Sequence, residues 1–279
     1  MIKNNEPIWF NKESPTRDQF KLQIDQKPYS LFVATPVHSD VSMHYTQSLL
    51  GLQKWCFYNK VKVAFQIMKC SLVTSGRNMC VAEFLKKEEF THFLFIDSDI
   101  AFNEGAAGRL IQADKDVISI PYPLKDMGWD KALDRIQNNK IKTVEDLRNK
   151  SFYRYPFKVA NPESIQVRNG VIEVTHSPTG FMMIKRSVFE KMMKAYPNLA
   201  INQDQVVNGK NQKLTHMWNF FDTWFDPEKQ TYLGEDFAFC KRWKDIGGKC
   251  HAWIMDYITH VGEHQYTGRF ADELILPDK

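Results

Sequence analysis

Runs of consecutive apolar residues alternate along the chain with amphipathic segments, and this order predicts an α/β fold. Residues 93–96 are apolar without alternation, which is typical of a strand buried on both faces. Residues 43–58 carry apolar side chains at helical spacing, which is typical of a helix that covers a sheet. The predicted strands lie at 29–35, 61–68, 93–96, 116–121, 179–184 and 253–258, and the predicted helices at 43–58, 77–90, 105–113, 143–149, 187–195 and 235–246.

The order of these segments predicts the architecture. Strand, helix, strand, helix and strand follow one another over the first part of the chain, which favours a mostly parallel central sheet flanked by helices. Residues 126–176 are polar and charged and are predicted to form an irregular insertion, in which Asn169-Gly170 indicates a small antiparallel hairpin. We therefore expect an N-terminal extension at 1–28 and a single domain at 29–279.

Local signals predict where some elements begin and end. Pro36 is expected to stop the first strand, because proline has no N–H to donate. Ser187 is expected to cap the helix that follows it. Gly247 and Gly248 are expected to end the helix at 235–246.

Composition narrows the class of protein. The 279 residues are 43% hydrophobic and 25% charged, as in a soluble globular protein, and the net charge of +4 suits an anionic cosubstrate without requiring one. Five cysteines form no C-x-x-C pair, which favours reduced thiols. There is no apolar N-terminal region of the signal-peptide kind and no apolar stretch of about eighteen residues. We expect a cytoplasmic protein without a membrane span.

Candidate chemistry begins where the apolar run 93–96 ends. Asp97 and Asp99 follow it directly, and in an open α/β sheet ligands bind at the carboxyl ends of strands. Two carboxylates one residue apart can both reach a divalent cation if the chain turns there. A solvated turn or the cap of a following helix is the alternative explanation.

Six short motifs occur in a fixed order between residues 29 and 269. They are Thr35-Pro36, Arg77-Asn78, Asp97-Ser98-Asp99, Thr179-Gly180-Phe181, Glu235-Asp236 and His260-Val261-Gly262. Together they resemble a nucleotide-sugar glycosyltransferase of the GT-A type, among the small soluble enzymes of viruses and bacteria. The resemblance implies a Rossmann-like sheet, Mn²⁺ or Mg²⁺ as cofactor and a nucleoside diphosphate sugar as donor. For a viral enzyme the compartment is the host cytoplasm.

The resemblance also implies a metal site. Asp97 would hold the ribose or a metal-bound water, Asp99 would ligate the cation, and His260 would add a further ligand, with His264 as the fallback. A cation that neutralises the leaving diphosphate lowers the barrier, and an imidazole among the ligands favours Mn²⁺ over Mg²⁺. For His260 a hydrogen-bonded histidine at a strand end is the alternative.

Glu235 and Asp236 resemble the position at which inverting members of the family keep a catalytic base. Asp236 is preferred as the base and Glu235 is second, because a carboxylate there can take the proton of an acceptor hydroxyl. In a retaining enzyme the same acids contact the acceptor or the donor sugar. Both acids also suit a helix N-terminus through its macrodipole, so the alternative is a structural role.

Further donor contacts follow from the resemblance. Arg77, Lys125 and Arg269 are candidates to bind the diphosphate or the base, with surface solvation as the alternative. Glycine permits close approach of the backbone to a sugar. The resemblance assigns the nucleobase pocket to Thr35, Pro36 and His38, and the donor-sugar contact to Gly180 and Phe181.

The acceptor stays open between a glycan or small molecule and a hydroxymethylated base in viral DNA. A DNA acceptor needs phosphate contacts and aromatic stacking surfaces. The insertion has a basic bias from Lys140, Lys142, Arg148, Lys150, Arg154 and Lys158. The aromatic residues of 197–230 are expected in the core more than in an acceptor wall. Two other classes remain, a noncatalytic nucleotide or nucleic-acid binding module and a nucleotidyltransferase.

Overall fold

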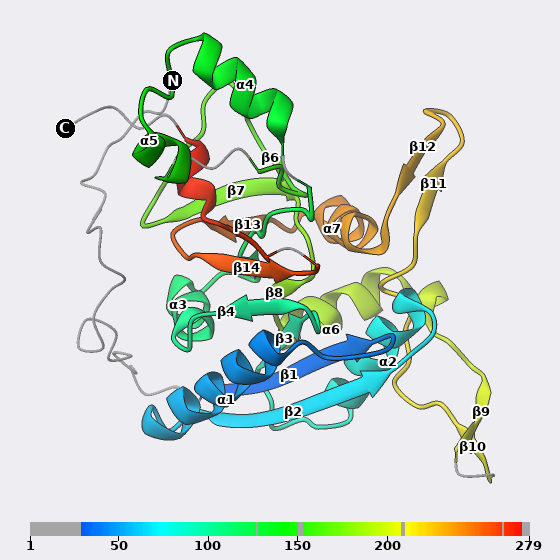
Figure 1. The fold of residues 1–279 in the computed structure, drawn as a ribbon. Coiled ribbons are helices and arrows are strands. Elements are labelled where there is room, and N and C mark those ends of the chain that lie inside the picture. Colours follow the sequence, from blue (N-terminus) through cyan, green and yellow to red (C-terminus); the bar gives the residue numbers. More distant parts are fainter. Residues whose placement is uncertain (1–28, 127, 150–152, 208–209, 264, 275–279) are drawn as a thin grey trace.

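The computed structural model describes residues 29–126, 128–149, 153–207, 210–263 and 265–274. They form a mixed α/β fold in which helices flank a large central sheet (Figure 1). The predicted extension at 1–28, Lys150 and His264 lie outside the described residues.

Eight strands form the central sheet in the order β2-β1-β3-β8-β5-β13-β7-β6. Their bounds are β1 Ser30–Val37, β2 Lys62–Lys69, β3 His92–Ile96, β5 Val117–Ser119, β6 Lys158–Val159, β7 Val171–His176, β8 Phe181–Lys185 and β13 Cys250–Trp253. Strand β1 pairs in parallel with β2 and β3, and β5 pairs in parallel with β13. The other pairs are antiparallel, because β8 lies between β3 and β5 in the opposite direction and β7 opposes both β13 and β6. The parallel arrangement is thus confirmed for β2-β1-β3, and the remainder is mixed.

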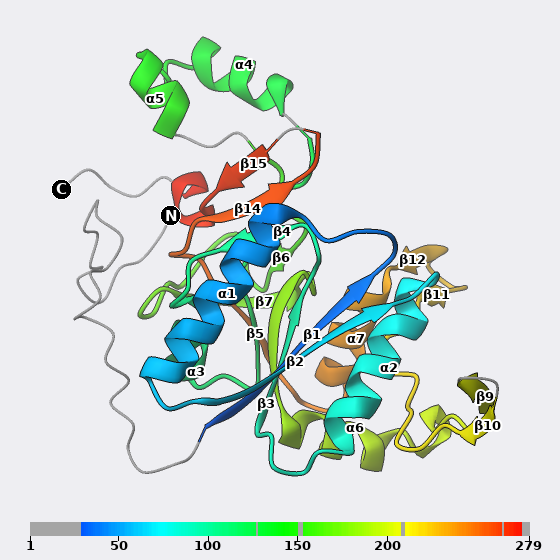
Figure 2. The ribbon, with the colours of Figure 1, turned by 60° about the horizontal axis from the view of Figure 1, so that its bottom comes forward.

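Helices cover both faces of this sheet (Figure 2). Side chains of β1 alternate between two cores, since Leu31 and Val33 pack with helices α1 and α3, whereas Phe32 and Ala34 pack with α2, α6 and α7. The helices are α1 Met43–Tyr58, α2 Val73–Leu85, α3 Ala106–Ala113, α4 Trp129–Gln137, α5 Val144–Asn149, α6 Arg186–Ala195 and α7 Glu235–Asp245.

Shorter strands complete the described fold. A three-stranded sheet joins β4 Ile100–Phe102 to β14 Ile258–Val261 and β15 Gln265–Gly268. Two hairpins pair β9 Asp204–Val207 with β10 Lys210–Lys213 and β11 Trp224–Asp226 with β12 Thr231–Leu233. Short 3-10 turns lie at Pro197–Leu199 and Phe270–Glu273. Among the described residues, every helix falls short of the length and apolar character that crossing a bilayer demands.

Several expected boundaries were wrong. Strand β1 continues through Pro36 to Val37, because β3 pairs with β1 only as far as Ala34 and leaves β1 bordered on one side at the proline. Helix α6 begins before Ser187, since β8 runs into it without a loop and the N–H of Arg186 donates to the carbonyl of Thr91 at 3.0 Å.

Two longer elements also differ from expectation. Helix α2 begins at Val73, so Arg77 lies in its second turn and not at its start. The predicted strand at 253–258 spans a break, because Asp256 there accepts hydrogen bonds from Arg109 and Trp253, and a new strand starts at Ile258. Helix α4, in the predicted insertion, had no counterpart among the expected elements.

The hairpin turn and the aromatic segment match expectation in part. Asn169 and Gly170 both have positive φ, 48° and 74°, as their turn requires, and Arg168 and Val171 on either side of it form an antiparallel bridge with two hydrogen bonds of 2.9 Å. Further along, β7 pairs with β6 and β13 and not with residues before Arg168. Phe220 and Phe221 are fully buried in the core, whereas Phe225 is exposed.

Candidate active site

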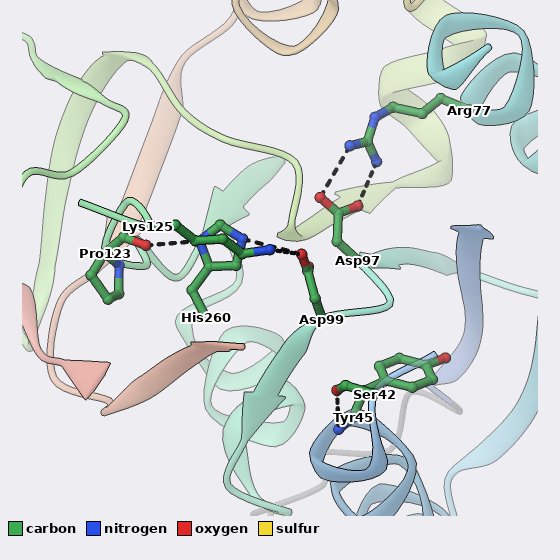
Figure 3. A network of polar contacts seen from close by, with 8 residues as sticks. All are labelled: Ser42, Tyr45, Arg77, Asp97, Asp99, Pro123, Lys125 and His260. Carbon is green, nitrogen blue, oxygen red and sulfur yellow. Dashed lines mark hydrogen bonds and ion pairs between the residues drawn. The ribbon is translucent and has the colours of Figure 1, made fainter. Parts of the chain in front are cut away.

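The acidic turn Asp97–Asp99 is fixed in place by its backbone. It connects β3 to β4, and the N–H of Asp97 donates to the carbonyl of Gly180 at 2.9 Å. The carbonyl of Asp99 accepts from the N–H of Val261 at 2.7 Å, and that of Ser98 from Ser42 at 2.9 Å. Strands β8 and β14 and the N-terminus of α1 therefore converge on the turn. Figure 3 shows its two carboxylates directed to different partners.

Arg77 joins the acidic turn to the start of α7. Its Nη1 and Nη2 donate to the two carboxylate oxygens of Asp97 at 3.0 and 3.3 Å, and its Nε donates to Oε1 of Glu235 at 3.1 Å. The Arg77 side chain is 5% exposed. Burial opposes its charge, but the carboxylates of Asp97 and Glu235 outweigh burial and leave the pKa of the guanidinium above its usual value. Residues 77, 97 and 235 thus form one charged cluster.

Asp99 faces a second cluster. Its Oδ2 accepts from Nζ of Lys125 at 2.6 Å and lies 3.4 Å from Nε2 of His260 (Figure 3). Burial raises the pKa of Asp99, but His260 and Lys125 together lower it below its usual value. Asp99 is therefore an ionised carboxylate that already faces a cation.

The orientation of His260 is set by the segment that follows β5. Its Nδ1 lies 2.9 Å from the carbonyl oxygen of Pro123, so Nδ1 carries a proton and donates it. The other ring nitrogen, Nε2, is then the atom that faces Asp99. Metal-ligating histidines characteristically hold their other nitrogen in this way.

Tyr122 connects the two clusters. It is 9% exposed, and its ring lies edge-on to that of His260 with centroids 5.0 Å apart. Burial raises the pKa of its phenol well above the usual value, and the charges of Asp97, Asp236 and Asp99 raise it further. Tyr122 is therefore within electrostatic reach of Asp97, Asp99 and Asp236.

Asp236 differs from its neighbour Glu235. Burial, followed by the charge of Glu235, raises the pKa of Asp236 to about 6. Its Oδ1 accepts from the N–H of Phe237 at 2.7 Å. A carboxylate with this pKa is ionised at neutral pH and still basic enough to accept a proton.

The other residues predicted to contact the donor do not gather at the acidic turn in the same way. Thr35 is fully buried with its hydroxyl 2.6 Å from that of Tyr45, and Phe181 is fully buried against Phe102. Both side chains belong to the core. His38 is exposed just after β1. Pro36 lies in β1, and its side chain is within 3.4 Å of the position that a Cβ at residue 76 would take.

Gly180 lies beside the acidic turn, whereas Arg269 lies beside Tyr257. The backbone of Gly180 supports both the acidic turn and the ring of Tyr122. The guanidinium of Arg269 lies 4.7 Å from the ring centroid of Tyr257, beyond the end of β15 that pairs with the start of β14. The described contacts therefore associate Arg269 with Tyr257.

The basic residues of the predicted insertion are dispersed. Arg154 pairs with Asp126 at 3.5 Å and with Asp130 at 2.8 Å. Lys140, Lys142 and Lys158 are exposed. The side chain of Arg148 and the whole of Lys150 lie outside the described part of the chain.

Metal ligation has two described donors. No group of three or more His, Cys, Asp or Glu side chains among the described residues is arranged to hold a metal ion, because Asp97 faces Arg77. Asp99 and His260 present a carboxylate and an imidazole, with Lys125 as the cation beside them. Two protein ligands suffice where substrate phosphates and water complete the shell, as they do at many Mg²⁺ sites.

Cavities of about 360 and about 650 Å³ lie elsewhere, lined in common by Lys115, Lys249 and His251 at the sheet end where β5 and β13 begin. Neither includes a residue of the acidic turn. We locate the candidate site by the convergence of ionised groups, because reactive chemistry depends on charge and donor geometry more than on hollow volume.

Sequence reasoning missed Tyr122 and Ser42. Tyr122 follows a predicted buried strand directly, as Asp97 does, and an aromatic residue between two prolines at such a strand end was an available signal. Ser42 carried no signal beyond its place before a predicted helix.

Comparisons with known proteins give the fold little context. No family model matches the chain, and no curated protein sequence matches it significantly. The protein A197 from STIV is 15% identical over 90% of this chain and 95% of its own, with a TM-score of 0.45. A glycosyltransferase involved in glycosylation of the major capsid of PBCV-1 is 10% identical over 61% and 68%, with a TM-score of 0.32. HddC from Yersinia pseudotuberculosis is 11% identical over 58% and 79%, with a TM-score of 0.30. Likeness at this level assigns no function, so the chemistry of the site carries the proposals below.

Proposed function

We propose that this chain is a metal-dependent glycosyltransferase that moves a sugar from a nucleoside diphosphate sugar to an acceptor hydroxyl. The observation that carries the proposal is the set of contacts at the acidic turn, where Arg77 joins Asp97 to Glu235 and Asp99 lies beside Lys125 and His260. These residues come from distant parts of the sequence and lie where ligands bind in open α/β sheets.

The charge of the site supports a divalent cation. Within the described residues, the four carboxylates of Asp97, Asp99, Glu235 and Asp236 are accompanied in this cluster by two permanent cations, Arg77 and Lys125. An unaccompanied diphosphate would be repelled by that excess of negative charge. A cation held by Asp99 and His260 would offset it and stabilise the charge that develops on the leaving diphosphate. The mixed oxygen and nitrogen donors favour Mn²⁺, with Mg²⁺ as the alternative.

The chain's own residues then have distinct tasks. Arg77 and Lys125, the cations paired with Asp97 and Asp99, would bind phosphate oxygens, the former through a planar fork and the latter as a point charge. Asp236 accepts the proton of the attacking hydroxyl, for which its pKa of about 6 is well suited. Glu235 is held by Arg77 and raises the pKa of Asp236, so its task is to position and tune.

A noncatalytic nucleotide-binding module is the second candidate, because Arg77 and Lys125 already neutralise Asp97 and Asp99 in the described arrangement. Such a module would bind a nucleotide without turning it over.

The acceptor, whether glycan, small molecule or modified DNA base, stays a prediction. A nucleotidyltransferase would release pyrophosphate, which separates it from an enzyme that releases a nucleoside diphosphate.

The test is release of nucleoside diphosphate from a panel of nucleotide sugars, with Mn²⁺ and with a chelator. We expect metal-dependent release by the unaltered protein, a loss of at least about 100-fold in Asp99→Asn, and a similar loss in Asp236→Asn for transfer to an acceptor. Release that is equal in Asp99→Asn, or equal with the chelator, would refute the proposal. Binding without any release would favour the noncatalytic module.

A further inference from the structure

The hydroxyl of Tyr122 lacks a hydrogen-bond partner among the described residues. The side chain is 9% exposed, whereas the comparably enclosed Tyr45 places its hydroxyl 2.6 Å from that of Thr35. Within the described part of the chain, Nδ1 of His251 is the polar side-chain atom that is both inaccessible to solvent and without a hydrogen-bond partner. The Tyr122 oxygen also has no partner but does not belong to this class, so it is accessible to solvent. The phenol therefore ends in space that solvent or a ligand can enter.

The ring of Tyr122 is fixed on two sides. It stands edge-on to His260 at 71°, and it lies against the backbone of Gly180. A Cβ at residue 180 would lie 2.5 Å from Cε1 of the ring and 2.7 Å from its hydroxyl oxygen. Only glycine leaves room for the ring in this position.

The Tyr122 hydroxyl, beside His260 and Gly180, carries a proton that it can donate, as a phenol ordinarily does at neutral pH. The group is thus a neutral donor in a cluster whose other donors are the cations Arg77 and Lys125, and each of these already contacts a carboxylate. A phosphate oxygen is the strong acceptor that three such donors can share.

We propose that Tyr122 is a ligand-binding residue whose hydroxyl donates a hydrogen bond to a diphosphate oxygen of the nucleotide, and that Gly180 exists at its position to admit the Tyr122 ring. This inference rests on the proposed function, because it uses the same site and the same class of ligand. It adds a contact that neither sequence motifs nor charge alone assign, and it gives Gly180 a task other than contact with the donor sugar.

The experiment compares Tyr122→Phe with the unaltered protein. Phenylalanine keeps the ring against His260 and Gly180 and removes only the hydroxyl. The probes are the diphosphates of uridine, guanosine, adenosine, cytidine and thymidine with Mn²⁺, titrated by calorimetry. Loss of a hydrogen bond to a charged group should weaken binding of the best of them by roughly 10- to 100-fold. The unliganded melting temperature should be unchanged, because the hydroxyl bonds to no described protein group.

The matched control is Tyr196→Phe. The Tyr196 hydroxyl donates to the carbonyl of Arg242 at 2.9 Å, at the C-terminal ends of α6 and α7. This variant should bind nucleoside diphosphates as the unaltered protein does. Gly180→Ala should weaken binding although the hydroxyl is retained, because the ring must move.

The outcomes separate the two proposals. If the unaltered protein binds a nucleoside diphosphate and Tyr122→Phe binds it equally well, the inference is wrong and the proposed function stands. If the unaltered protein binds none of the five, both are overturned. Weakened binding in Tyr122→Phe with normal binding in Tyr196→Phe supports the inference.

Discussion

Arg77 is the side chain that holds the two acidic segments of the site together. It is almost fully buried and pairs with both Asp97 and Glu235, which are themselves partly enclosed. Replacing it with methionine leaves two carboxylates close to one another without a cation. We expect Arg77→Met to lower the free energy of unfolding by about 3 kcal/mol, in the range measured for breaking a buried ion pair from one side.

Urea denaturation at neutral pH measures this loss. Lys86→Met is the control, because Lys86 pairs with Glu83 at 2.6 Å on the surface and such exposed pairs contribute at most about 1 kcal/mol. An Arg77→Met protein that is no less stable than Lys86→Met would show that the cluster does not hold the segments together.

Asp236 makes stability depend on pH in a predictable direction. Its pKa is about 6 in the folded protein against 3.8 as its ordinary value, so the folded state binds the proton more tightly. Its contribution to stability is complete below about pH 4 and is lost as the pH rises through 6. We expect the unaltered protein to lose stability relative to Asp236→Asn across this interval, as measured by urea denaturation at several pH values.

Glu235→Gln provides a check on the cause. The charge of Glu235 is the second cause of the raised pKa of Asp236, after burial, and the substitution removes it. The pKa of Asp236 in the folded protein should therefore fall, and the loss of stability should be complete at a lower pH. A stability difference between the unaltered protein and Asp236→Asn that does not vary with pH would contradict the raised pKa.

Single residues were predictable from the sequence where a local pattern marked them. Asp97 and Asp99 follow an unbroken apolar strand, and Glu235 with Asp236 opens a helix, so each pair was found from its neighbours. Tyr122 was missed because its importance lies in contacts with Gly180 and His260, which are distant in sequence.

At the scale of elements, helix α1 supports the acidic turn through its first residues. The hydroxyl of Ser42 accepts from the N–H of Tyr45 at 3.0 Å (Figure 3). The N–H of Ser42 donates to the carbonyl of Ser98 at 2.9 Å. Loss of such a cap destabilises a protein by about 1 kcal/mol. We expect Ser42→Ala to lower stability by about that amount.

Ser42→Asp is the matched variant, because a carboxylate caps the same N–H groups and suits the helix dipole. It should be as stable as the unaltered protein in thermal denaturation. Equal stability of Ser42→Ala and Ser42→Asp would show that the capping hydrogen bond contributes little.

Helices and strands with a regular pattern of apolar residues were predicted correctly as elements, but the residues at which they begin and end were predicted less accurately. Helix α1 was predicted with its observed bounds. Helix α2 begins four residues before the predicted start, and its first residues carry no capping signal because Leu72, before them, has no capping side chain. The strand predicted at 253–258 failed because the chain leaves the sheet to bring Asp256 to Arg109. That ion pair spans 147 residues, so no local pattern reveals it.

At the scale of the whole molecule, the alternation of strands and helices predicted an α/β sheet and the parallel directions of β2, β1 and β3, but not the antiparallel strands. Strand β8 enters between β3 and β5 antiparallel to both, which places Gly180 beside the acidic turn. Strand direction depends on connections between segments far apart in sequence, and those connections cannot be read from periodicity. Gly180, directly before β8, contacts both the ring of Tyr122 and the acidic turn.

The excess of carboxylates over cations is also a property of the whole site. It follows that a nucleoside diphosphate should bind well only together with a divalent cation. Each component alone should bind weakly, because the cation lacks phosphate ligands and the anion meets repulsion from four carboxylates.

The most direct test is calorimetric titration of a nucleoside diphosphate panel into the protein with Mn²⁺ and with a chelator, for the unaltered chain and for Asp99→Asn. We expect at least one diphosphate to bind at least about 100-fold more tightly with Mn²⁺, since a coupling of this size is typical between linked ligands. Asp99→Asn should abolish that gain. Binding that does not depend on Mn²⁺, or a gain that Asp99→Asn retains, would contradict the assignment of this site.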